Sequence, residues 1–361
     1  MEEHRARGDV SGRRTHLRRR SIAYVSSEVP PGDPVYQGRR DYSEGFYVSM
    51  LTQDVAYSIM PHGSEAKGGK PPLRVELVPE DERAARLIAS GFTRRDFGGR
   101  AYKQDLADAV RDFVEGCAST IMRFGEAAYE IAYEYEPARE QSDEGRGGHA
   151  DQEAEQHRED TPCGFRLLFL DPRTLLCRGK AVYQRIPESI DTQRHVPRQV
   201  ELPVEHVVRF VPPAYIHSSL NGMLETLALA DAKHHVALYM QSRLSGAPRM
   251  GLDHAAYIRT VHVAVASTTR LIGWNARGTF ADEMDEYYLA DRQLRFARFR
   301  IELRTSIVES LNEALTHIGR HLGFTARLVL AGGMTLVDVH DAQARLAAGD
   351  THLGDILRPF L

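Results

Sequence analysis

The most constraining feature of this sequence is a stripe of apolar residues in its last quarter. The stripe residues are spaced 4, 4, 4, 4, 3 and 4 apart: Phe299, Leu303, Ile307, Leu311, Leu315, Ile318 and Leu322. This spacing predicts one buried face of a helix of about six turns, and Gly323 stands just past its end. From a start near Asp282 the helix would have about 40 residues and a length of roughly 60 Å, which exceeds the diameter of a small domain. We therefore expect an elongated or oligomeric protein whose neighbouring subunits cover the stripe.

The composition fits a globular chain of two or three domains. The 361 residues are 42% apolar and 27% charged, and the mean hydropathy is -0.40. No stretch approaches the roughly 18 uninterrupted apolar residues of a membrane span, and the N-terminus has no long apolar segment of a signal peptide. Cys117, Cys163 and Cys177 form no C-x-x-C pair, so we expect neither a disulfide framework nor a zinc site, and an intracellular setting.

Two segments interrupt the ordered part of the chain. Residues 1–45 carry Arg13-Arg14 and Arg18-Arg19-Arg20 but little apolar periodicity, which predicts an extended basic arm that orders only against a partner. Residues 137–162 are rich in Asp, Glu and Gly and predict a solvated acidic loop. The net charge is only -4, and the excess of arginine over lysine has two explanations. Codon usage can cause it, and so can a need to pair with phosphates or carboxylates.

Periodicity predicts the elements between these segments. Residues 103–123 have the apolar spacing of an amphipathic helix that ends at Gly125, and residues 127–135 alternate as a strand does. Further strands are predicted at 164–170, 180–186 and 204–211.

The C-terminal part is predicted to be mainly helical. Asn221 can cap a helix that reaches Leu244, and a mixed region follows at 250–280. After the long helix, residues 327–339 predict two short strands around Gly332-Gly333, followed by a polar helix.

No strong catalytic motif is present: the chain lacks G-x-x-x-x-G-K-[ST], G-x-S-x-G and H-E-x-x-H. His317 and His321 are four apart on one helical face, but position 318 is Ile rather than the Glu of a zinc protease. His234 and His235 would point about 100° apart on a helix, so core or interface roles suit them better than a shared ion. A third grouping, Asp338, His340 and Asp341, is common in loops of this composition. We expect no enzyme, no cofactor and no metal site.

A series of short segments occurs in a distinctive order. They are 124–131 (FGEAAYEI), 169–172 (FLDP), 205–210 (EHVVRF), 221–226 (NGMLET), 243–249 (RLSGAPR) and 291–299 (DRQLRFARF). In this order they resemble the portal proteins of tailed bacteriophages, and most nearly those of contractile-tailed phages.

The resemblance implies an α+β fold with a mixed α/β wing, a long-helix stem, a short clip and a small C-terminal crown. On this interpretation the domains are a basic arm (1–45), a wing (46–219) with the acidic loop, a first stem helix (220–248), a clip (249–281), a second stem helix (282–323), and a wing return with a short crown (324–361).

The resemblance also implies a function. Portal subunits form a ring, usually of twelve, at one capsid vertex of the virion, after assembly in the host cytoplasm. Double-stranded DNA passes through the ring during packaging and ejection. The expected partners are other copies of the chain, the major capsid protein, the terminase large subunit and a head–tail adaptor or neck protein, with no membrane.

The same interpretation assigns roles to particular residues. Candidates for contact with DNA in the channel, or with a neighbouring subunit, are Arg243, Arg249, Arg292, Arg295, Arg298 and Arg304. Candidates for the core of the subunit contact are Phe299, Leu303, Ile307, Leu311 and Leu315. Trp274 and Arg277 are expected to be exposed where the clip meets a partner, although a tryptophan packed in a small local core is the alternative.

Two other classes of function remain open at this point. A nucleic-acid-binding regulator or an assembly scaffold without a channel would use the arginine-rich arm and would dimerise through the long helix, but no reading module such as a helix-turn-helix is present. A metal-dependent hydrolase would depend on His317 and His321.

Overall fold

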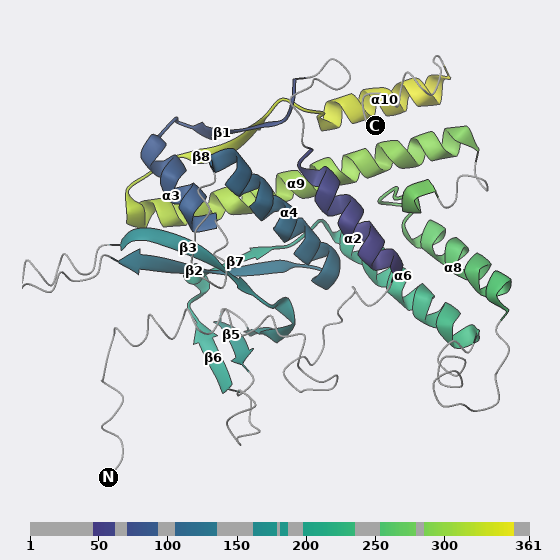
Figure 1. Ribbon diagram of the computed structural model, residues 1–361, viewed down its shortest axis with the longest axis horizontal. Coiled ribbons are helices and arrows are strands. Elements are labelled where there is room, and N and C mark those ends of the chain that lie inside the picture. Colours follow the sequence, from purple (N-terminus) through teal and green to yellow (C-terminus); the bar gives the residue numbers. More distant parts are fainter. Residues whose placement is uncertain are drawn as a thin grey trace, which may run out of the picture.

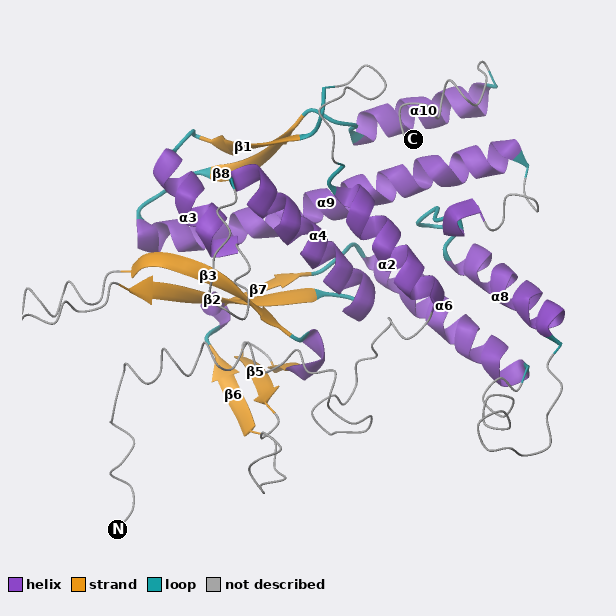
Figure 2. Ribbon diagram, in the orientation of Figure 1, coloured by secondary structure: helices purple, strands orange, loops and turns teal. Residues whose placement is uncertain are grey.

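The computed structural model describes residues 46–61, 71–92, 105–135, 162–178, 181–186, 198–234, 253–278 and 285–349. The predictions for the basic arm, for most of the acidic loop and for Arg243 and Arg249 lie outside these residues. The described residues fold into helices and antiparallel strands (Figures 1 and 2). A mixed α+β architecture was predicted.

The helices are α2 (Phe46–Ile59), α3 (Glu82–Phe92), α4 (Leu106–Phe124), α6 (Ala214–Lys233), α8 (His254–Thr268), α9 (Glu286–Leu322) and α10 (Leu336–Ala348). The strands are β1 (Arg74–Val78), β2 (Ala127–Tyr135), β3 (Pro162–Leu170), β4 (Leu175–Arg178), β5 (Ala181–Ile186), β6 (Arg198–Leu202), β7 (Val207–Phe210) and β8 (Arg327–Ala331). Short 3₁₀ turns lie at Pro172–Thr174 (η3), Val204–His206 (η4) and Ala276–Gly278 (η5).

The strands form three small sheets in the orders β3-β2-β7, β4-β5-β6 and β1-β8. Helices α3 and α4 pack on one side of the β3-β2-β7 sheet (Figure 2). Ala128 of β2 faces the other side and packs in a small cluster with Val182 and Leu202 of the second sheet. The β1-β8 sheet joins residues far apart in sequence, since Arg74 pairs with Ala331.

Helix α4 illustrates how local signals and packing agree. Asp105 caps its N-terminus by accepting a hydrogen bond from the Asp108 backbone, and Gly125 ends it in a left-handed conformation (φ 81°). Its buried face includes Phe113, whose ring lies 4.9 Å from those of both Phe92 and Tyr129. The helix therefore joins α3 to the sheet through one aromatic cluster.

The apolar stripe of α9 is buried inside this chain, which corrects the expectation that neighbouring subunits cover it. Phe299, Leu303, Ile307, Leu311 and Leu315 are each at most 1% exposed. They are covered because α2, α4, β3, β7 and β8 all pack against α9. The length of α9 was predicted well: Asp285 caps its start and Gly323 its end.

Some boundaries differ from those predicted. Helix α6 begins at Ala214, directly after Pro212-Pro213, so Asn221 lies inside the helix rather than at its cap. Residues 254–268 of the region expected to be mixed form the regular helix α8.

The predicted strand after Gly333 is instead the start of α10. Thr335 and Asp338 form a capping box there, in which each side chain bonds the backbone of the other residue. The strand predicted at 204–211 is shorter than expected, because Val204–His206 is a 3₁₀ turn that precedes β7.

Candidate functional site

Three of the six segments that carry the family resemblance, 124–131, 169–172 and 205–210, come together in one sheet. Strand β2 pairs with β3 on one edge, where Ala128 faces Leu170, and with β7 on the other, where Ala128 faces Arg209. Glu126, just before β2, is buried and forms an ion pair with Arg209. Segments up to 83 positions apart in the sequence therefore support one another directly.

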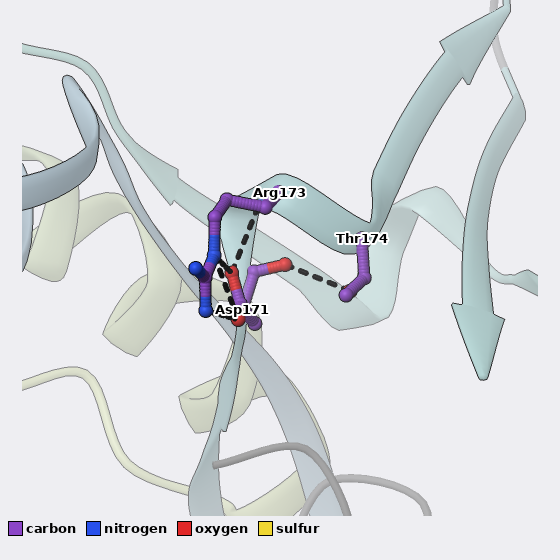
Figure 3. Close-up of polar contacts among 3 residues, drawn as sticks. All are labelled: Asp171, Arg173 and Thr174. Atoms are coloured by element: carbon purple, nitrogen blue, oxygen red, sulfur yellow. Dashed lines mark hydrogen bonds and ion pairs between the residues drawn. The ribbon is translucent and has the colours of Figure 1, made fainter. Parts of the chain in front are cut away.

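The turn after β3 is held by its aspartate. The Asp171 carboxylate is buried and accepts hydrogen bonds from the Arg173 backbone at 2.9 Å and from its guanidinium at 2.7 Å (Figure 3). Thr174 Oγ1 donates to the Asp171 carbonyl at 2.8 Å. Pro172 fixes the backbone at the first position of the turn, so this sequence fixes the angle between β3 and β4. These bonds indicate a structural role for the turn.

Helices α6 and α8 form an antiparallel pair that extends away from the sheets (Figure 1). The ends of the pair that meet the body are both bound to α9: the Tyr215 hydroxyl donates to Glu302, and Arg292 Nη1 donates to the Ala266 carbonyl at 2.9 Å. At the far end, His234 Nε2 lies 3.0 Å from Thr260 Oγ1. On the outer surface of the pair, Leu229 is 69% and Val263 is 65% exposed.

The turn after α8 buries the only tryptophan. Trp274 is 1% exposed, and its indole N–H donates to Asp54 Oδ2 of α2 at 2.8 Å. The exposure expected for Trp274 is therefore wrong. The tryptophan is packed, as the alternative had it, but in the main core rather than in a small local one. Arg277 is exposed, with Nε 2.7 Å from Asp54 Oδ1. Gly273 is required in this turn, because its φ is 76° and a Cβ there would lie 2.2 Å from the Arg292 carbonyl.

The four arginines of α9 that were predicted to contact DNA or a neighbouring subunit divide into two groups. Arg292 and Arg304 are at most 7% exposed, which corrects the expectation that they face a channel or a neighbour. Each donates to a carbonyl near the C-terminal end of another helix: Arg292 to Ala266 of α8, and Arg304 Nη1 to Ile59 of α2 at 3.1 Å. The carbonyl end of a helix carries partial negative charge, so the guanidinium groups serve as caps.

The second group of arginines is ion-paired near the surface. Arg295 lies 2.7 Å from Asp291, and Arg298 lies 2.7 Å from Glu302, each one turn along α9. Contact of these two with DNA or with a neighbouring subunit stays a prediction.

A histidine cluster lies where the C-terminal end of α9 meets β2 and η4. The rings of His317 and His321 are 5.0 Å apart, and Tyr133 lies 5.1 Å from His321 and 5.7 Å from His206. Burial lowers the pKa of His206 and of His317, and the charge of His321 lowers both further. Burial also raises the pKa of Tyr133 to about 12. The sequence indicated only His317 and His321 on α9, because His206 lies on a segment that is distant in the sequence.

No group of three or more side chains within the described ranges is arranged to hold a metal ion. Asp338 is engaged in the capping box of α10, while His340 and Asp341 are exposed on that helix. None of the described helices is long and apolar enough to cross a bilayer. His235 lies outside the described residues.

No protein-family model matches the chain, and no curated protein matches it. Among solved structures, the chain is similar to the crystal structure of an HK97 family phage portal protein from Corynebacterium diphtheriae. The two share 11% identity, the match covers 80% of this chain and 93% of that one, and the TM-score is 0.35.

Proposed function

We propose that this chain is a portal protein, a subunit of a ring at one capsid vertex through which DNA is packaged and ejected. The observation that carries the proposal is the α6–α8 pair. It leaves a mixed α/β body, is anchored to α9 at its base, and comes in the sequence after the segments of the β3-β2-β7 sheet, in the order that a wing and a stem require. On this proposal the ring docks the terminase large subunit, a head–tail adaptor and the major capsid protein in the virion.

The packing supports a revised assignment of the stem. The sequence interpretation paired α6 with α9 and placed the clip at 249–281. In the structure α8 packs along α6, whereas α9 packs among the sheets and α2 and α4 of the body. We therefore assign α6 and α8 to the stem and α9 to the wing. The segment between the stem helices, which would contain the clip, lies outside the described residues.

The charge pattern of α9 suits weak contacts with DNA or with neighbouring subunits. Arg295 and Arg298 are each neutralised by a carboxylate. A surface of paired charges gives a moving polyanion no deep electrostatic well, in contrast to a row of unpaired arginines.

The mass of the purified full-length particle tests the proposal. A ring of twelve chains of 40.6 kDa would weigh about 490 kDa, and projection images would show a central channel. Co-expression with the major capsid protein, without tail proteins, is a second test. In it the rings should be incorporated at one vertex of each capsid. A stable dimer of about 80 kDa without a channel contradicts the proposal and favours a regulator or an assembly scaffold.

A further inference from the structure

Arg300 and Arg304 form a pair of guanidinium groups on α9 with no ion pair to any carboxylate in the described part of the chain. They stand one helical turn apart, so their side chains lie on the same face. Arg304 is 7% exposed, and its Nε is buried without a hydrogen-bond partner. Arg300 is partly exposed, and its guanidinium carbon lies 4.9 Å from the centre of the Phe296 ring.

The groups that contact this pair are neutral. Arg304 donates from Nη1 to the Ile59 carbonyl at 3.1 Å and from Nη2 to the Met334 carbonyl at 3.5 Å, near the end of α2 and the start of α10 (Figure 1). Carbonyl dipoles offset only part of the cost of removing a cation from water. Arg295 and Arg298 on the same helix each have a carboxylate at 2.7 Å, so this pair differs from the two arginines that precede it on α9.

The electrostatics agree with an uncompensated positive charge. Burial lowers the pKa of Arg300 to about 10. Burial, and then the charge of Arg300, lower the pKa of Arg304 to about 10. Both groups are still protonated at pH 7, so two like charges stand together in a poorly solvated place. A negative ligand that contacts Arg300 from the solvent side would relieve the repulsion.

We propose that Arg300 and Arg304 form a binding site for a phosphate-class oxyanion, with Arg300 as the solvent-side contact and Arg304 as the fixed charge behind it. A planar guanidinium presents paired N–H donors that match two oxygens of a phosphate group. The Phe296 ring limits the orientations of Arg300, which lowers the entropy lost on binding. The proposal does not depend on ring assembly. The phosphate can be free or part of a nucleic acid backbone.

Inorganic phosphate and pyrophosphate, compared with chloride at equal ionic strength, test the site in the full-length chain. We expect both phosphates to raise the melting temperature more than chloride does, and calorimetry to detect binding. Arg300→Gln should weaken pyrophosphate binding at least about tenfold, since one charge-assisted contact is removed. It should leave the melting temperature in chloride unchanged. Arg111→Gln on α4 is the matched control, because Arg111 is paired with Asp108 at 2.7 Å and lies outside the proposed site, and this variant should bind as the parent does.

A second variant and a DNA duplex complete the test. Arg304→Gln should also lose phosphate binding but with a lower melting temperature in chloride, because its two carbonyl bonds are lost. If the ligand is a nucleic acid phosphate, Arg300→Gln weakens duplex binding and phosphate competes with the duplex; if it is free phosphate, duplex binding is unchanged. Equal effects of phosphate and chloride, or full phosphate binding by Arg300→Gln, would overturn the site. Loss of assembly in Arg300→Gln with an unchanged phosphate response would also overturn it, and would indicate a carboxylate of a neighbouring copy instead.

Discussion

At the scale of single residues, the histidine cluster makes stability depend on pH. His206 and His317 have lowered pKa values in the folded chain, whereas an unfolded histidine titrates near its ordinary value of 6.5. Well above pH 6.5 the two histidines are neutral in both the folded and the unfolded chain, so they give stability no pH dependence there. As the pH falls below 6.5 the unfolded chain binds protons first, and stability is lost until the folded pKa values are passed. The facing groups that modify this titration are Glu205, which raises the pKa of both, and Arg320, which lowers that of His317.

We therefore predict that the free energy of unfolding, measured with urea at pH 7.5, 6.5 and 5.5, is lower at pH 5.5 than at pH 6.5. His317→Asn should flatten this fall, because the substituted side chain takes up no proton, and His340→Asn on the exposed face of α10 should not. An equal pH dependence in the parent and in His317→Asn would show that the cluster is not the cause.

Asp54 is the second residue whose role can be measured directly. It accepts the buried indole N–H of Trp274 and also pairs with Arg277, so Asp54→Ala leaves a buried donor unsatisfied. We expect a loss of about 1–3 kcal/mol in the free energy of unfolding. Asp291→Ala, which breaks the partly exposed ion pair with Arg295, should cost about 0–1 kcal/mol. Trp274→Phe removes the same donor, so the double variant with Asp54→Ala should cost less than the sum of the two single changes.

At the scale of elements, the buried stripe of α9 stabilises the single chain. Leu311 is 0% exposed and packs in the main core. Leu311→Ala should lower the free energy of unfolding by about 2–5 kcal/mol, because it removes apolar contacts and leaves a cavity. The exposed Val337→Ala on α10 is the control and should change it by less than about 0.5 kcal/mol. If Leu311→Ala abolished assembly at an unchanged melting temperature, the stripe would have to serve subunit contacts after all.

Elements with strong local signals were the ones that could be predicted. Residues 106–124 and 286–322 have clear helical periodicity with Asp and Gly at their capping positions, and residues 127–135 alternate as a strand does. Strand β1 was not predicted, because its partner β8 lies about 250 residues later and the pairing leaves no local signature. The same reason applies to the site: Arg304 is buried by α2, 245 positions away, so the sequence could not show whether it faces inward.

At the scale of the whole molecule, the exposed apolar side chains of the α6–α8 pair offer a test of assembly that leaves the fold intact. Leu229 is 69% and Val263 is 65% exposed, on helices that the proposed function places in the stem. Substitutions at such exposed positions usually change stability by less than about 0.5 kcal/mol. A carboxylate buried in a subunit contact without a partner, however, is strongly unfavourable.

The double variant Leu229→Asp/Val263→Asp should therefore keep the melting temperature of the isolated chain but fail to form the ring. Native mass measurement over a range of protein concentrations would follow this as a shift from the ring towards the single chain of 40.6 kDa. Tyr57→Asp on α2 is the matched control, since Tyr57 is 76% exposed but lies outside the stem pair. If the double variant assembles as the parent does, the outer surface of α6 and α8 is not a subunit contact and the stem assignment fails. If Tyr57→Asp alone prevents assembly, the contact lies on the wing instead.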